Sequence, residues 1–124
     1  MGRLAVAVGW ALGFASAASC ATQSVHPEAI KHHDLGVAHL AEGECVQAEE
    51  RCRLALEYGP AFQHPHNCLG LVALDCRQDL DAAAQHFKDA IALDGDFAEA
   101  HNNLGTTFFR RDPPDYQAAC DEVR

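Results

Sequence analysis

Cysteine and histidine are the residue types with the most chemistry in this 124-residue chain, which has six of the first and eight of the second. Thiols form disulfides, bind metals or act as nucleophiles, and imidazoles bind metals or transfer protons. The sequence contains neither CxxC nor HExxH, and it has no Gly-x-Ser-x-Gly and no phosphate-binding glycine loop. We therefore predict no catalytic residue, no metal site and no cofactor, and we do not expect an enzyme.

Two close pairs of histidines deserve a separate test for metal binding: His32 with His33, and His64 with His66. Side chains that share a helix face are three or four residues apart, so neither pair has the spacing of a chelating helical pair. His32, His66 and His101 instead recur at one position of a longer period. We expect these three to fill space between helices.

Charge argues against nucleic acid as a partner, because the formal net charge is -9 and no basic cluster stands out. Four aspartates lie between the apolar segments, where we expect them to cap helices and to aid solubility. They are Asp79, Asp81, Asp94 and Asp96.

A repeat in the sequence predicts the helices that hold these cysteines and histidines. A Leu followed by Gly recurs at positions 35, 69 and 104, which are 34 and 35 residues apart. A fixed period of this length is typical of a helical repeat array. The three copies are Leu35-Gly36, Leu69-Gly70 and Leu104-Gly105. In a helical hairpin the glycines let two helices approach closely, and large apolar residues fill the space between them.

This pattern resembles the tetratricopeptide repeat (TPR), and the resemblance covers residues 29–124. It implies an all-α fold of helical hairpins stacked as a short right-handed superhelix of about two and a half repeats, following an N-terminal signal peptide. The repeats would be residues 29–62, 63–97 and an incomplete 98–124. The sequence departs from the pattern at Cys52, at one inserted residue near Asp79, at Gly95 and at Pro113-Pro114.

The N-terminus is typical of an export signal, with Arg3 before an apolar run at 4–14 that is too short to span a bilayer. Small residues and Cys20 follow. The segment Ala17-Ala18-Ser19-Cys20 resembles a bacterial lipobox, which implies a signal peptide at 1–19, lipid on Cys20 and a tether at 20–28. The implied location is the periplasmic face of the outer membrane. Cleavage after Ala17 is the alternative, and it would give a soluble periplasmic or secreted protein.

Four other cysteines suggest disulfides, provided that the chain is exported to an oxidising compartment. Cys45 and Cys52 fall on the second helix of the first repeat, and Cys68 and Cys76 fall on the next helix. Where two antiparallel helices face each other, the two residue numbers of each facing pair have a nearly constant sum, which we call the index sum. This rule pairs Cys45 with Cys76 and Cys52 with Cys68. Four free buried thiols are the alternative. Cys120 has no obvious partner.

The resemblance places function on the concave surface, which is lined mainly by the first helix of each repeat. The surface is mostly apolar with a few amides and suits an apolar or amphipathic peptide. Its candidate residues are His33, Val37, Leu40, Asn67, Leu71, Leu74, Asn102, Thr106 and Phe109. Leu40 and Leu74 have core packing as their alternative role. The lysines of the family's peptide-carboxylate clamp are missing, so we do not expect acidic C-termini to bind.

The lipobox together with LGVAHLAEG, HNCLGLV and NNLGTTFFRR resembles the pilotin lipoproteins that help outer-membrane secretins to assemble in type IV pilus biogenesis. This resemblance implies a scaffold that holds a secretin subunit and reaches the membrane through its lipid. Two other functions stay open: a truncated remnant of a longer repeat protein with no activity of its own, and a thiol- or metal-handling periplasmic protein.

Overall fold

The computed structural model describes residues 24–111 and 115–123, and every regular element in this part of the chain is helical. The predicted signal peptide, the lipid-attachment residue Cys20 and the insertion at Pro113-Pro114 lie outside the described residues. The helices are α1 (Pro27–Ala41), α2 (Cys45–Tyr58), α3 (Gln63–Leu71), the π-helical η1 (Val72–Cys76), α4 (Leu80–Leu93), α5 (Ala98–Phe109) and α6 (Tyr116–Glu122).

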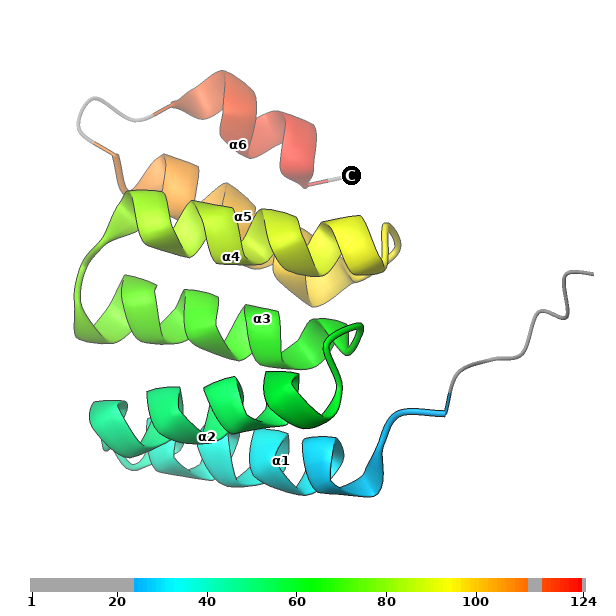
Figure 1. Cartoon of the computed structure of the whole chain (residues 1–124). Coiled ribbons are helices and arrows are strands. Elements are labelled where there is room, and N and C mark those ends of the chain that lie inside the picture. Colours follow the sequence, from blue (N-terminus) through cyan, green and yellow to red (C-terminus); the bar gives the residue numbers. More distant parts are fainter. Residues whose placement is uncertain (1–23, 112–114, 124) are drawn as a thin grey trace, which may run out of the picture.

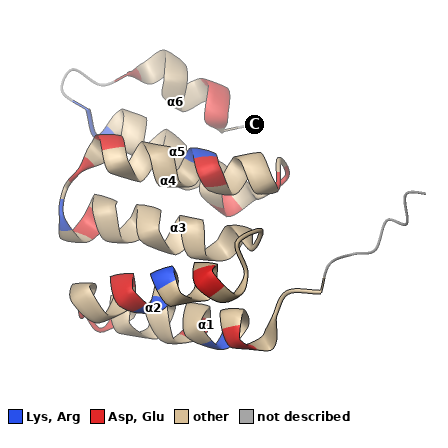
Figure 2. Ribbon diagram, viewed as in Figure 1, with Lys and Arg blue, Asp and Glu red and all other residues tan. Residues whose placement is uncertain are grey.

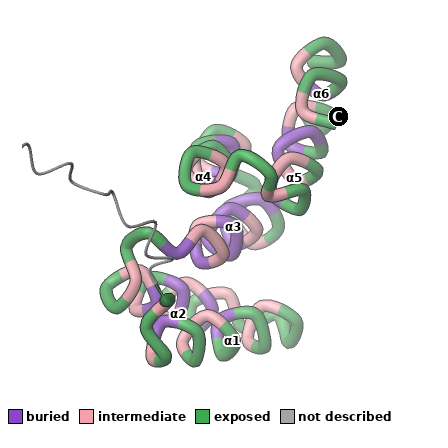
Figure 3. Tube along the Cα trace, turned by 90° about the vertical axis from the view of Figure 1, so that its right-hand side faces the viewer, coloured by how far each residue is buried: buried purple, intermediate pink, exposed green. Residues whose placement is uncertain are grey.

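The helices form three hairpins, α1–α2, α3–α4 and α5–α6, which stack in chain order from bottom to top in Figure 1. The view in Figure 3 shows the offset between successive helices, with α4 on one side of the stack and α5 and α6 on the other. α3 begins at Gln63 and α5 at Ala98, the residues at which the predicted second and third repeats start. The predicted all-α hairpin array is confirmed.

Helix α1 begins at Pro27, two residues before the start of the first predicted repeat at residue 29. Pro27 stands at the first helical position, where its missing N–H is not needed, and the ring Nδ1 of His26 accepts a hydrogen bond from the Glu28 backbone N–H at 3.2 Å. These two features place Pro27 and Glu28 inside the helix.

Two aspartates cap later helices through their side chains. Asp79 Oδ1 accepts from the Ala82 backbone N–H at 3.0 Å at the start of α4. Asp115 does the same for the Ala118 backbone N–H at 3.1 Å at the start of α6. Each satisfies one of the backbone donors that a helix start leaves without a partner.

The second repeat has one residue in excess, and the structure places it at the end of the α3–η1 segment. Residues Val72–Cys76 adopt the π form, whose i→i+5 bonds accommodate an extra residue. Gln78 then takes a left-handed conformation (φ 54°), and the Asp79 backbone N–H bonds the Ala73 carbonyl at 2.9 Å. The insertion predicted near Asp79 is thus absorbed without loss of the hairpin.

Close approach within the second hairpin depends on Gly70. A Cβ atom at this position would lie 2.6 Å from Cδ1 and 2.8 Å from Cζ of the Phe87 ring. Phe87 is fully buried and belongs to a core that joins the second hairpin to Leu104 of α5. The recurrent glycine therefore leaves the space that the Phe87 ring fills, as the repeat pattern predicted.

Acidic residues outnumber basic ones on the surface, and Figure 2 shows Asp and Glu spread over most of the helices. The few cations are largely paired with them: Arg77 and Arg53 with Glu49, Arg110 with Asp75, and Arg111 with Asp81. Among the described residues, no helix is both long and apolar enough to cross a bilayer.

Candidate functional site

Two disulfides join the first hairpin to the second in the structure, with the pairings that the index-sum argument predicted. Cys45 is bonded to Cys76, and Cys52 to Cys68, with S–S distances of 2.03 and 2.00 Å. Cys52 and Cys68 are buried and pack with Leu69 in a small apolar cluster between α2 and α3. The bridges hold the first and second hairpins in one fixed register.

A large apolar hollow lies between α5 and α6, with a volume of about 810 Å³. It brings together three of the predicted groove residues, Asn102, Thr106 and Phe109, all of which are exposed. We call it the α5–α6 pocket. Its other lining residues are Gly105 and Arg110 from the α5 side, and Ala119, Cys120 and Val123 from the α6 side. The sequence reasoning missed the α6 wall because the pattern places the groove on first helices.

The three predicted residues of the second repeat do not form a comparable open surface. Leu74 is only 3 % exposed and belongs to the main core, and Leu71 packs against that core. The Asn67 amide is 4 % exposed: its Nδ2 donates to Glu99 at 2.8 Å, and its oxygen accepts from Asn103 Nδ2 at 2.9 Å. Asn67 is therefore bonded to α5 and buried instead of lining an open groove, and Leu74 has the core-packing role that was its alternative.

In the first repeat the predicted groove residues differ in exposure. Val37 is exposed and Leu40 is half-buried. His33 lies against the rings of Phe62 and His64, at centroid distances of 5.5 and 5.6 Å. The structure thus places His33 in an aromatic contact instead of leaving it free on the surface.

A row of rings runs from His33 on α1 through Phe62 and His64 at the start of α3 to Phe97 at the start of α5. The centroids of Phe62 and His64 are 5.0 Å apart, and those of His64 and Phe97 are 4.7 Å apart. Burial, followed by the neighbouring His33, lowers the pKa of His64 below its ordinary value. The sequence offered one signal for this row, since Phe62 and Phe97 both end a predicted repeat.

His101 ties α5 to α6. Its Nε2 is 2.8 Å from the Gly95 carbonyl oxygen, and its Nδ1 is 2.9 Å from a carboxylate oxygen of Glu122. The bond to the Gly95 carbonyl, followed by the bond to Glu122, raises the pKa of His101 above its ordinary value. The imidazolium form donates both bonds, so protonation favours the docked position of α6.

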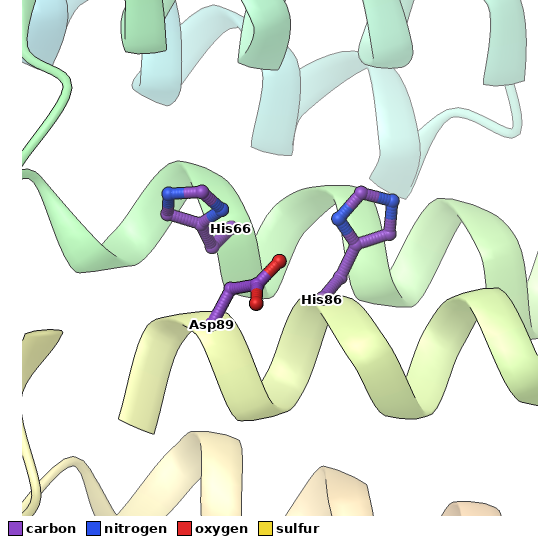
Figure 4. A group of neighbouring side chains, drawn as sticks. All are labelled: His66, His86 and Asp89. Atoms are coloured by element: carbon purple, nitrogen blue, oxygen red, sulfur yellow. The ribbon is translucent and has the colours of Figure 1, made fainter. Parts of the chain in front are cut away.

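Another histidine of this recurrent position, His66, lies beside His86 and Asp89 of the facing helix α4. Figure 4 shows the His86 and Asp89 side chains rising from α4 toward α3, which carries His66. The three residues are half-buried, and burial lowers the pKa of both His66 and His86. The sequence reasoning considered only neighbouring histidines within one helix, so it missed this grouping.

Comparison with known proteins supports the fold. A family model described as TPR repeat matches residues 77–111, which include α4 and α5. No curated protein matches the chain. Among solved structures, the second TPR of Spaghetti (RPAP3) bound to the HSP90 peptide SRMEEVD is similar, with a TM-score of 0.69 and 23% sequence identity. The match covers 78% of this chain and 87% of that chain. The fold is therefore that of a TPR helical array.

Proposed function

We propose that this protein is a non-enzymatic scaffold that binds an apolar or amphipathic segment of a partner protein in the α5–α6 pocket. The observation that carries the proposal is the pocket itself, where the Phe109 side chain is 58% exposed beside Gly105 and Val123. Burying such a ring together with its apolar surroundings is a main source of affinity in peptide recognition.

The repeat register supports this choice of pocket. Asn102 and Phe109 stand 35 residues after Asn67 and Leu74, which are buried because α5 packs over them. No described helix packs in the same way over Asn102 and Phe109. A segment that takes the place of such a helix would bury the same register positions of the third hairpin.

The polar groups of the pocket favour a segment with little negative charge. Arg110 is the one cation that lines it among the described residues, and its guanidinium lies 3.1 Å from Asp75. The peptide in the similar solved structure carries consecutive glutamates. A pocket with one cation that is already paired offers little to such a peptide, so we assign apolar contacts the larger share of the affinity.

Site-specific photo-crosslinking tests the proposal. A photoreactive amino acid at Thr106 or Phe109 should give the same adduct with one partner, because both positions line the pocket. Val46 is the matched control, since it is apolar and 76% exposed but lies on α2. Adducts that form equally well from Val46, or from none of the three positions, would reject the α5–α6 pocket as the binding site. The second result would favour a remnant without activity of its own.

We further propose that the scaffold works at the periplasmic face of an outer membrane, anchored through lipid on Cys20. The lipobox resemblance supports the anchor, and two disulfides suit an oxidising compartment. The intact mass of the exported protein tests it: a start at Cys20 with added lipid is expected. A start at Ala18 without lipid would leave a soluble periplasmic or secreted protein.

For the partner we propose a secretin subunit, on the resemblance to pilotin lipoproteins. Deleting the gene should abolish secretin multimers, and restoring it with Phe109→Asp should not bring them back. Restoring it with Val46→Asp is the control and should. Multimers that persist in the deletion strain would exclude the secretin while leaving the α5–α6 pocket to be tested by crosslinking.

A further inference from the structure

Helices α3 and α4 together present two imidazoles and one carboxylate to a single point. His86 and Asp89 are three residues apart on α4 and therefore share a face, and His66 stands opposite them on α3. Each side chain offers one ligand atom, and these atoms all lie within 4.8 Å of one another. Figure 4 shows the carboxylate between the two rings. We propose that His66, His86 and Asp89 form a binding site for a divalent transition-metal ion of the Zn²⁺ type.

The donor chemistry fits this class of ion. Zn²⁺ binds neutral imidazole nitrogens and carboxylate oxygens at about 2.0–2.2 Å, and sites with three protein ligands keep a fourth position open. Tetrahedral coordination at that bond length places ligand atoms about 3.3 Å apart, so the three groups need to close by at most about 1.5 Å. Rotation of half-buried side chains supplies movements of that size.

An independent observation at the same place is that the two imidazoles leave polar atoms without partners. Nδ1 of His66 and Nδ1 of His86 are both buried, and neither has a hydrogen-bond partner in the described part of the chain. A buried nitrogen without a partner costs stability, and such groups are rare in folded proteins. An ion bound by these two rings would hold them at a place where the protein itself leaves buried ring nitrogens without partners.

Neighbouring residues support the carboxylate and set the charge around the site. Gln85 Nε2 donates to Asp89 Oδ1 at 2.8 Å, which is the kind of outer contact that orients a metal ligand. On α2, the Glu49 carboxylate and the Arg53 guanidinium place opposite charges near His86. Glu49 is bonded to both Arg53 and Arg77, so it offsets the cations next to the site.

A second cluster of possible ligands serves as the comparison. His39, Glu42 and Glu44 also bring ligand atoms within 4.8 Å of one another, at the turn after α1. There the imidazole is already engaged, because His39 Nδ1 bonds a Glu44 carboxylate oxygen. The cluster of His39, Glu42 and Glu44 therefore provides a control with similar donors but without a buried ring nitrogen that lacks a partner.

Zinc titration of the full chain tests the site, with the disulfides formed, no affinity tag, and Cys120→Ser to remove the exposed thiol. Calorimetry should show one Zn²⁺ per chain, and Co²⁺ should give the absorption bands of a tetrahedral ion. His86→Gln and Asp89→Asn should each lower the affinity at least tenfold. His39→Gln should leave it unchanged.

Circular dichroism checks that each variant is folded. If His86→Gln does not fold, Asp89→Asn still tests the site, because it preserves the shape of the side chain. The proposal is overturned by no Zn²⁺ binding to the parent chain, by unchanged affinity in Asp89→Asn, or by a loss confined to His39→Gln. The readout is metal binding alone, so it does not depend on the partner segment or on the α5–α6 pocket.

Discussion

Replacing Gly70 by Ala tests the packing between α3 and α4 directly. The added methyl group would overlap the Phe87 ring, with Cβ 2.6 Å from Cδ1 and 2.8 Å from Cζ. Phe87 is fully buried within the main core, so the ring has no solvent-facing direction in which to move. Overpacking of this kind costs about 1–3 kcal/mol, whereas the better helix propensity of Ala returns about 1 kcal/mol. Because the new Cβ would lie under 3.0 Å from ring atoms, the upper part of that range applies, about 2–3 kcal/mol, and we expect a net loss of about 1–2 kcal/mol in the free energy of unfolding.

Urea denaturation measures this loss as a lower midpoint at unchanged slope. Two other glycines supply a graded series. At Gly105 the nearest atom to a new Cβ is Cγ2 of Val123 at 3.0 Å, near the end of the chain, and this side chain has room to move. At Gly95 no atom lies within 4 Å. Gly95→Ala should change stability by less than about 0.5 kcal/mol, and Gly105→Ala should fall between the two.

The double variant Gly70→Ala with Phe87→Leu isolates the contact. If the overlap is the cause, the smaller side chain makes room for the methyl group, and the double variant loses less stability than the two single losses added together. A Gly70→Ala protein as stable as the parent would refute the reasoning. So would strictly additive losses, because they would place the cost of the methyl group somewhere other than the Phe87 ring.

Two further predictions concern bonds between helices. Replacing Cys52 and Cys68 together by Ser should lower the free energy of unfolding by about 3 kcal/mol in the chain-entropy account, since the bridged residues are 16 apart in sequence. A urea midpoint equal to that of the parent protein would show that the bridge adds no stability. His101 has a raised pKa, so its stabilising bonds to Glu122 and the Gly95 carbonyl are fully present below the unfolded pKa and are lost as the pH rises through the folded value. The stability deficit of His101→Gln should therefore be larger near pH 5.5 than near pH 8.5, and a deficit independent of pH would contradict the assignment.

Local patterns in the sequence predicted the helices and their register well. The recurrent Leu-Gly pairs locate the first helix of each hairpin, because a glycine is needed wherever a neighbouring helix comes close. The structure forms the two disulfides along the antiparallel alignment of α2 with the next helix, which is the alignment that sequence spacing implied. The π form of η1 was not predicted, although the extra residue near Asp79 was.

Features that depend on contacts between helices were harder to predict. Asn67 and Leu74 have the residue types of a groove, but α5 buries them, and a repeat pattern does not say which faces the next helix covers. The histidine grouping was missed for a related reason. His66 and His86 belong to different helices, so neither the spacing within one helix nor the repeat period brings them together.

The position of the disulfides sets the order in which the array comes apart. Both bridges cross from α2 to the helix after it, so the first two hairpins open as one cooperative unit. No such bridge reaches the described part of the last hairpin, where the seven-residue α6 is the shortest of the α-helices. Local opening should therefore begin at α6. Because α6 forms one wall of the α5–α6 pocket, a segment bound there would slow hydrogen exchange in α6 before it affects the bridged hairpins.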